Sequence, residues 1–142
     1  MAKTVLVMLS GGLDSVAVLH LMLTDPVYAN YAIHAHHMNL ENVENRSLAE
    51  NIAVRNILHY FKTHGYRPFT YTESTLGYPL INGKQMRDPL AVAVTTGFIC
   101  NADQSIEIVA IGVNSDDINA EDVDNLMPVA ASIFHSFPSR AK

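Results

Sequence analysis

A pair of glycines separates the first apolar run of this chain from its first helical pattern. Thr4 to Leu9 is continuously apolar after its first residue, which is typical of a parallel strand buried on both faces. Ser10-Gly11-Gly12-Leu13-Asp14-Ser15 follows directly. Adjacent glycines permit backbone dihedrals that other residues avoid and let N–H groups approach a ligand closely. Because the N–H groups at a helix start favour negative charge, we expect a polyphosphate site here, with Asp14 or Ser15 capping the helix.

The glycine turn does not match the two common nucleotide-binding loops. A Walker A loop has the pattern Gly-x-x-x-x-Gly-Lys-Ser/Thr, and no lysine follows Gly11 and Gly12. The dinucleotide fingerprint Gly-x-Gly-x-x-Gly needs a glycine at Leu13 if it starts at Gly11, and a glycine at Ser15 if Gly12 is its second glycine. An ordinary strand-to-helix turn with a good cap is the remaining alternative to an anion site.

Strand and helix patterns alternate along the rest of the chain. Asp25-Pro26 ends the first helix, Gly65 ends the second, and Asp88-Pro89 opens the third. Ser74 to Arg87 contains glycine and proline and predicts a long loop. The predicted strands are Thr4–Leu9, Tyr28–His37, Arg67–Glu73 and Ile106–Ile111, and the predicted helices are Asp14–Leu23, Asn45 or Ser47 to His64, Leu90–Ala102, which should be buried, and Asn125–Phe137.

This alternation predicts an α/β fold, a doubly wound parallel sheet with helices on both faces, in a single domain over residues 1–142. Right-handed crossovers place ligands at the carboxyl ends of such strands. The glycine turn, His36 to Asn39 and Gly112 to Asp117 all lie at predicted strand ends. We therefore expect these three segments to meet on one rim of the sheet.

Composition excludes several classes of protein. The chain has 9 Lys and Arg against 14 Asp and Glu, a net charge of -5, which argues against a broad nucleic-acid surface. Cys100 is the only cysteine, so the chain has neither an internal disulfide nor a cluster of thiolates for zinc. It shows no signal peptide and no apolar run long enough to span a bilayer. We expect a cytoplasmic protein without a membrane partner or a direct nucleic-acid partner.

Three motifs together resemble one enzyme family. Ser-Gly-Gly-x-Asp-Ser at 10–15 is similar to the PP-loop of the ATP pyrophosphatases. Met86-Arg87-Asp88 opens an apolar helix, and Ile111-Gly112-Val113-Asn114-Ser115-Asp116-Asp117 follows an apolar strand. With these motifs the chain, from its start to about Asp117, resembles the 7-cyano-7-deazaguanine synthase family. The resemblance implies a fold of the adenine nucleotide alpha hydrolase-like (HUP) type.

The resemblance also implies an ATP-dependent carbon–nitrogen ligase of 7-deazaguanine biosynthesis, the queuosine- and archaeosine-type pathways. Such an enzyme adenylates the carboxylate of 7-carboxy-7-deazaguanine with release of pyrophosphate. Ammonia then gives the amide, and a second activation and dehydration gives the nitrile. ATP and Mg²⁺ are the implied cofactors. The residues implied in nucleotide binding are Leu9, Ser10, Gly11, Gly12, Leu13, Asp14, Ser15 and His36.

Asp14, Ser15 and Arg87 are the candidate catalytic residues. Loop N–H groups and the Ser10 and Ser15 hydroxyls would stabilise the charge of departing pyrophosphate. The Asp14 carboxylate would hold Mg²⁺ directly or through water, although a plain helix cap is the alternative. Arg87 would clamp phosphate with its planar guanidinium, unless it is only an exposed arginine. The family has an Arg-Asn pair at this point, whereas this chain has Arg87-Asp88.

Polar residues after the last predicted strand are the candidate substrate contacts. Asn114, Asp116 and Asp117, together with Arg87, would read the edge of a deazaguanine or hold a second metal contact, although such residues are also common in turns. Glu41, Glu44 and Arg46 would orient substrate or form a solvated helix entry.

The histidines at 34, 36 and 37 invite a metal interpretation. On a strand, His34 and His36 share a face and His37 points the opposite way, so two of them at most would hold one ion. We favour ordinary packing and hydrogen bonding for these imidazoles.

The family chains are longer and carry a C-terminal cysteine cluster that binds zinc, whereas this chain has Cys100 alone. Zinc is therefore not expected here. A non-catalytic ATP-binding or regulatory protein is one alternative function, and another adenylating PP-loop enzyme is a second. The single cysteine argues against a thiolating enzyme, because sulfur transfer would need more cysteines. We expect a homodimer, because short parallel sheets often need an apolar edge covered.

Overall fold

The computed structural model describes residues 3–41, 45–77, 88–113, 126–138 and 141. Over these residues the chain forms a four-stranded, all-parallel sheet in the order β3-β2-β1-β4, a Rossmann-like α/β arrangement. The elements are β1 (Thr4–Met8), α1 (Leu13–Thr24), η1 (Pro26–Tyr28), β2 (Ala32–Glu41), α2 (Ser47–Thr63), β3 (Thr70–Gly77), α3 (Asp88–Ala102), β4 (Ile106–Ile111) and α5 (Leu126–His135).

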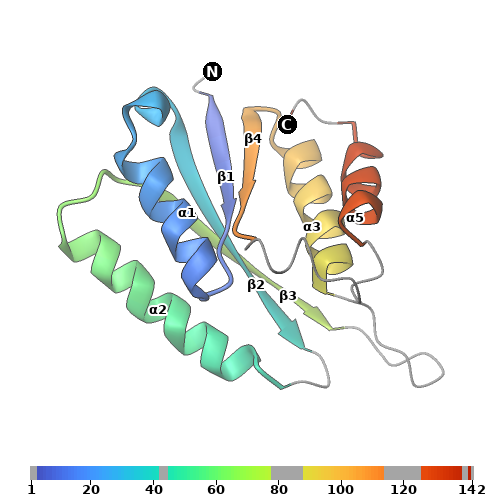
Figure 1. The fold of residues 1–142 in the computed structure, drawn as a ribbon, viewed down its shortest axis with the longest axis horizontal. Coiled ribbons are helices and arrows are strands. Elements are labelled where there is room, and N and C mark those ends of the chain that lie inside the picture. The colour runs from blue at the N-terminus through green and yellow to red at the C-terminus, as the bar shows by residue number, and fades with distance from the viewer. Residues whose placement is uncertain (1–2, 42–44, 78–87, 114–125, 139–140, 142) are drawn as a thin grey trace.

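Helices cover both faces of the sheet. Side chains alternate along each strand, so β1 presents apolar residues to both faces and each face packs against helices. Val5 and Val7 of β1 join a core with α1 and α2, which contributes Val54, Leu58 and Phe61. Leu6 and Met8 point to the other face and pack with Ala91 and Cys100 of α3. Figure 1 shows α1 and α2 on one side of β1, with α3 and α5 beyond β4. The predicted parallel sheet with flanking helices is confirmed.

The two strands farthest from β4 differ most from the prediction. β2 begins at Ala32 rather than Tyr28, because Pro26–Tyr28 forms a 3₁₀ turn in which the Asp25 carboxylate accepts from the Val27 N–H at 2.8 Å. β3 continues to Gly77 instead of ending at Glu73, so the predicted loop from Ser74 starts too early. The sequence pattern did not predict this extension, because the residues of β3 are mostly polar. Its backbone groups are satisfied by pairing with β2 as far as Glu41 opposite Gly77.

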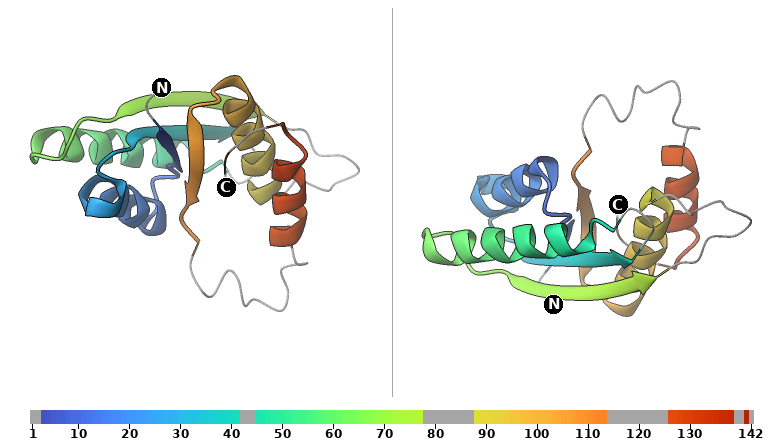
Figure 2. Two further views of the ribbon diagram at one scale, coloured as in Figure 1. Left: turned by 90° about the horizontal axis from the view of Figure 1, so that it is seen from above. Right: turned by 90° about the horizontal axis from the view of Figure 1, so that it is seen from below.

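As a result, β2 and β3 extend past the other two strands. β1 ends at Met8, which pairs with His36, and β2 runs on for the residues from His37 to Glu41. The views in Figure 2 show α2 lying along this pair of strands. The ends of β2 and β3 therefore project past the carboxyl end of β1.

The third helix is less buried than predicted. Ala91, Ala93, Thr96, Gly97 and Cys100 are buried, but Phe98 is 62% exposed. The helix packs on the sheet with one face and on α5 with another, which leaves a third side open. No helix among the described residues is long and apolar enough to cross a membrane.

Candidate functional site

The turn between β1 and α1 is a tight, glycine-dependent bend. Gly11 has a φ of +87°, in the left-handed region that favours glycine. A Cβ at this position would also lie 3.1 Å from the Glu50 carbonyl oxygen and 3.2 Å from a Val54 methyl group. Gly11 is thus required both by its backbone conformation and by the close approach of α2.

Two serine hydroxyls hold the bend together. The buried Ser15 hydroxyl donates to the Gly12 carbonyl at 3.0 Å and accepts from the Ser10 N–H at 3.1 Å. The Ser10 and Ser15 oxygens are 3.0 Å apart, and Ser10 must donate because Ser15 has one hydroxyl hydrogen, already given to Gly12. Ser10 in turn accepts from the Gly12 N–H at 3.3 Å. The loop is a closed hydrogen-bonded ring around Ser15.

The first backbone N–H groups of the helix that follows have no partner within the helix. Gly12, with extended backbone at φ -82° and ψ 164°, is the N-cap, and no side chain caps the helix. The first helical bond is from the Val16 N–H to the Gly12 carbonyl at 3.2 Å. The N–H groups of Leu13, Asp14 and Ser15 precede it and have no carbonyl partner within the helix. They form the positive end of α1.

The expectation that Asp14 or Ser15 caps this helix is wrong. α1 starts one residue earlier than predicted, at Leu13, so both residues lie inside its first turn. Ser15 is used to close the turn instead. Asp14 is exposed, and its carboxylate is therefore accessible to a cation from solvent.

The segment after β4 lies directly against this helix start. A Cβ on Gly112 would lie 2.5 Å from the Asp14 carbonyl carbon and 2.5 Å from the Ser15 nitrogen. The predicted meeting of the glycine turn with the residues after β4 is therefore confirmed at Gly112. Asn114, Asp116 and Asp117 continue from this segment, but they lie outside the described residues, as does Arg87.

His37 connects the glycine turn to the neighbouring strand and helix. Its Nδ1 donates to the Leu9 carbonyl at 2.8 Å, because a carbonyl oxygen only accepts. Its Nε2 lies 2.7 Å from Oδ1 of Asn51 on α2, and Asn51 donates to Asn39 at 3.1 Å. This network, in which His37 is only 2% exposed, fixes the backbone just before Ser10. Its signal in the sequence was a histidine on the apolar face of the second predicted strand, which it shares with Ile33 and Ala35.

His36 and His34 lie on the opposite face of β2, as predicted. The Thr72 hydroxyl of β3 lies 2.6 Å from His34 Nε2 and 2.7 Å from His36 Nδ1, and Ser74 Oγ lies 2.9 Å from His36 Nε2. Desolvation lowers the pKa of both rings, that of His36 to about 4. His36 is therefore neutral near pH 7. It lies within β2 rather than after it, opposite the last residue of β1.

The three histidines do not assemble a metal site. Among the described residues, no group of three or more His, Cys, Asp or Glu side chains could hold a metal ion. The imidazoles instead pair with hydroxyl, amide and carbonyl groups, the interpretation that the sequence favoured.

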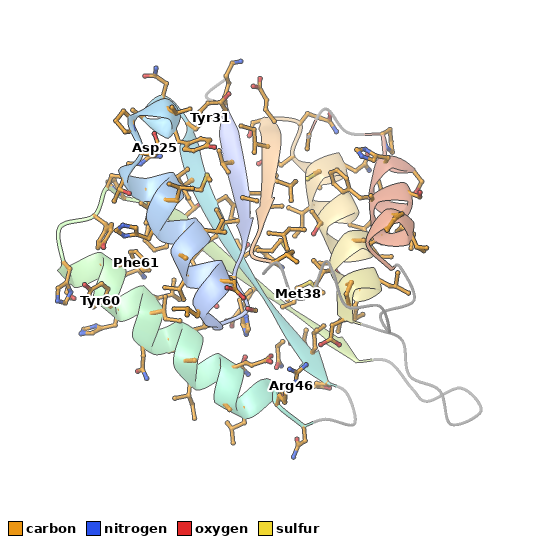
Figure 3. All side chains as sticks on the ribbon, viewed as in Figure 1. Asp25, Tyr31, Met38, Arg46, Tyr60 and Phe61 are labelled. Carbon is orange, nitrogen blue, oxygen red and sulfur yellow. The ribbon has the colours of Figure 1, made fainter. Side chains whose placement is uncertain are left out.

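An ion pair lies between the starts of α2 and α3. Arg46 Nη2 is 2.9 Å from Asp88 Oδ2, and Arg46 also lies 3.9 Å from Glu50. Figure 3 shows Arg46, the N-cap residue of α2, near the end of β2. Asp88 thus contacts a cation of another element. Glu41 ends β2 and is exposed, while Glu44 lies outside the described residues.

Comparison with known proteins gives no relative. No protein-family model, no curated protein and no solved structure matches this chain.

Proposed function

We propose that this protein is an ATP-dependent ligase of the PP-loop type that adenylates a carboxylic acid. The observation that carries the proposal is the closed serine–glycine turn leading into an uncapped helix start, with Gly112 packed against Asp14 and Ser15. This arrangement directs backbone donors and the positive end of a helix dipole to one place, which suits a polyphosphate. The finer fold proposed with it is a doubly wound sheet of the HUP type.

The residues of the turn fit the phosphates of ATP. The N–H groups of the exposed residues Leu13 and Asp14 would be the donors to phosphate, and the exposed Ser10 hydroxyl would turn from Ser15 toward the bound anion. A side chain on Gly11 or Gly112 would displace α2 or the start of α1. Bound Mg²⁺ would supply charge neutralisation, and the exposed Asp14 carboxylate would hold it.

The proposed acid is 7-carboxy-7-deazaguanine. A carboxylate oxygen of the acid bonds to the α-phosphorus as the bond to the bridging oxygen of pyrophosphate breaks. Ammonia then replaces AMP to give the amide, the intermediate on the way to a nitrile. In the first step the turn holds the leaving pyrophosphate, which spreads its developing negative charge over fixed donors. The support for this acid is the sequence resemblance alone.

The direct test is release of AMP and pyrophosphate. The protein is incubated with ATP, Mg²⁺, ammonium and 7-carboxy-7-deazaguanine, and AMP is measured with and without the acid. We expect AMP formation that depends on the acid, and the loss of most of this activity in Asp14→Asn. Glu107→Gln, which removes a surface ion pair with Lys3 at the opposite end of the sheet, is the matched control.

Calorimetry separates this activity from the alternative functions. ATP that binds but stays intact with this and other carboxylic acids would identify a nucleotide-binding protein without ligase activity. AMP formed only with a different acid would reject the deazaguanine substrate and keep the adenylating reaction. No saturable binding of Mg-ATP would reject the nucleotide site itself.

A further inference from the structure

A separate polar pocket lies between α2 and the projecting ends of β2 and β3. Its volume is about 190 Å³. Its walls come from three elements: His37 and Asn39 of β2, Asn51 and Arg55 of α2, and Tyr71 and Glu73 of β3. The pocket is small beside the clefts of roughly 300–1,000 Å³ that hold drug-sized ligands. It suits a molecule the size of an amino acid.

The periodicity of the three elements brings these side chains together. Asn51 and Arg55 are four residues apart and share one face of α2. Tyr71 and Glu73 alternate onto one face of β3, and the register sets Glu73 directly opposite His37. Farther along α2 the same side of the helix carries the core residues Val54, Leu58 and Phe61. The apolar layer under α2 therefore gives way to a polar depression at the helix's N-terminal half.

Two opposite charges face this pocket without pairing with each other. Within the described part of the chain, Arg55 has neither a hydrogen bond nor an ion pair, and it lies close enough to Tyr71 to interact with it electrostatically. Glu73 accepts one hydrogen bond at Oε2, from the Tyr71 hydroxyl at 2.9 Å. Desolvation raises the pKa of Tyr71 to about 12, so its phenol stays a donor to the carboxylate.

We propose that this pocket binds a small zwitterion of amino-acid size, with its carboxylate on Arg55 and its ammonium or amidinium group on Glu73. Arginine offers planar, charge-assisted donors to a carboxylate, and a carboxylate is the matching acceptor for a cationic nitrogen. An inorganic phosphate would meet the Glu73 carboxylate, and a bare metal cation would meet the Arg55 guanidinium. A ligand that carries both charges satisfies both groups.

Neutral polar groups complete the pocket. The amides of Asn39 and Asn51 offer both donors and acceptors beside the two charges. These groups suit a ligand side chain that is polar rather than aliphatic. The proposal does not depend on the chemistry of the glycine turn, because none of the turn's residues lines the pocket.

The test uses the intact protein without nucleotide. Each of the common L-amino acids is titrated while ¹H–¹⁵N NMR follows the side-chain signals of Asn39, Asn51 and Arg55, and calorimetry measures affinity. We expect one or more polar amino acids to shift these signals saturably. Arg55→Gln and Glu73→Gln should each weaken binding by about tenfold or more, because each removes one charge-assisted contact. Lys62→Gln, which removes an exposed cation near the far end of the same helix, should leave the affinity unchanged.

A second measurement changes the ligand instead of the protein, so that it does not depend on whether the variants fold. On the wild-type protein, the N-acetyl and carboxamide derivatives of the best amino acid each lack one charge and should bind about tenfold or more weakly. The proposal is overturned if no amino acid binds saturably. It is also overturned if neither the two substitutions nor the two capped derivatives change the measured affinity. Because ATP is absent, failure here leaves the proposed ligase untouched, and failure of the ligase leaves this pocket untouched.

Discussion

At the scale of single residues, Gly112 is the clearest case of a position closed to any side chain. The backbone after β4 contacts the first turn of α1 so closely that a Cβ would lie within 2.5 Å of two backbone atoms. Neither backbone segment is a flexible side-chain end that could move aside. The glycine therefore joins two parts of the candidate site that are far apart in the sequence.

We expect Gly112→Ala to destabilise the protein by about 2–3 kcal/mol, because the added methyl group forces α1 and the segment after β4 apart. Urea unfolding followed by circular dichroism measures the change. Gly77→Ala is the control, since its Cβ would make an ordinary contact of 3.6 Å with Glu41. Equal effects of the two substitutions would contradict the packing described for Gly112.

His36 provides a prediction about pH. Its pKa in the folded protein is about 4, below the ordinary histidine pKa of 6.5, mainly because burial disfavours the charged ring. Between these two values the unfolded chain binds more protons than the folded chain, so stability falls as the pH falls. The contribution is fully present above pH 6.5 and is lost on acidification toward pH 4.

The shift corresponds to about 3 kcal/mol, which is the upper limit of the expected loss for this one group. Urea unfolding at several pH values should show it, and His36→Gln should flatten the slope in this range. An NMR titration of the ring checks the cause directly. A midpoint above pH 6 would show that burial does not control this imidazole.

At the scale of elements, the connection from α1 to β2 is organised by one arginine. Arg67, just before β3, donates to the Met22 carbonyl at 2.7 Å, the Tyr28 carbonyl at 2.9 Å and the Tyr31 carbonyl at 2.7 Å. These carbonyls belong to the end of α1 and to the turn before β2. Asp25 and Tyr31, labelled in Figure 3, mark that connection. The guanidinium therefore donates to carbonyl groups, from the end of α1 to the start of β2, that regular secondary structure leaves without a partner.

Arg67→Met should cost about 2–4 kcal/mol in unfolding free energy, because several carbonyls lose charge-assisted donors at once. Arg67→Lys should recover only a part of this, since an ammonium group cannot match the fork of a guanidinium. Thermal unfolding of the two variants beside the wild type gives the comparison. Full recovery by lysine would mean that charge, and not geometry, is what the connection needs.

The pairing of α3 with α5 depends on a small residue facing a large ring. A Cβ on Gly97 would overlap the Phe137 ring. Phe137 also meets Phe98 in an edge-to-face contact, with ring centroids 5.0 Å apart. Phe137 lies just beyond α5, so this contact helps to hold the two helices together.

A double-mutant cycle tests this contact. Gly97→Ala alone should destabilise the protein by about 1–3 kcal/mol through overpacking. In the background of Phe137→Ala the same substitution should cost much less, or become favourable, because alanine is the better helix former. Additive effects of the two changes would show that Gly97 and Phe137 do not interact in solution.

On the scale of the whole molecule, the candidate nucleotide site draws together segments that are distant in the chain. The turn after β1, the residues after β4 and the backbone of α2 all meet around Gly11 and Gly112. A ligand bound there would contact the folded arrangement and not the unfolded chain. Such binding must raise stability by mass action.

Mg-ATP at about 100 times its dissociation constant should therefore stabilise the protein by about 2.7 kcal/mol. Thermal unfolding with increasing Mg-ATP measures this, and Gly11→Val should abolish the increase because valine is strained at a φ of +87° and would contact α2. An unfolding temperature that does not depend on nucleotide concentration would argue against a nucleotide site.

Helix faces show where sequence patterning is insufficient. The apolar stripe of α2 includes Leu48 and Ile52, yet these side chains are 70% and 52% exposed. Asn51, between them in the sequence, points inward and pairs with His37. The periodicity of apolar residues predicts the helix. It cannot show that a polar residue such as Asn51, and not a neighbouring apolar one, faces the sheet.

The amino-acid sequence by itself determined the order of strands and helices, the parallel sheet and the glycine turn, because these depend on local periodicity and on residues with special backbone freedom. Only the tertiary structure decided the length of β2 and β3, the role of His37 and the pocket beside Arg55. Each of these depends on a partner that is distant in the sequence: a strand satisfied by pairing, a ring held by a carbonyl, or charges brought together by register. The glycine turn was visible as a motif, whereas the contacts that hold it rigid were not.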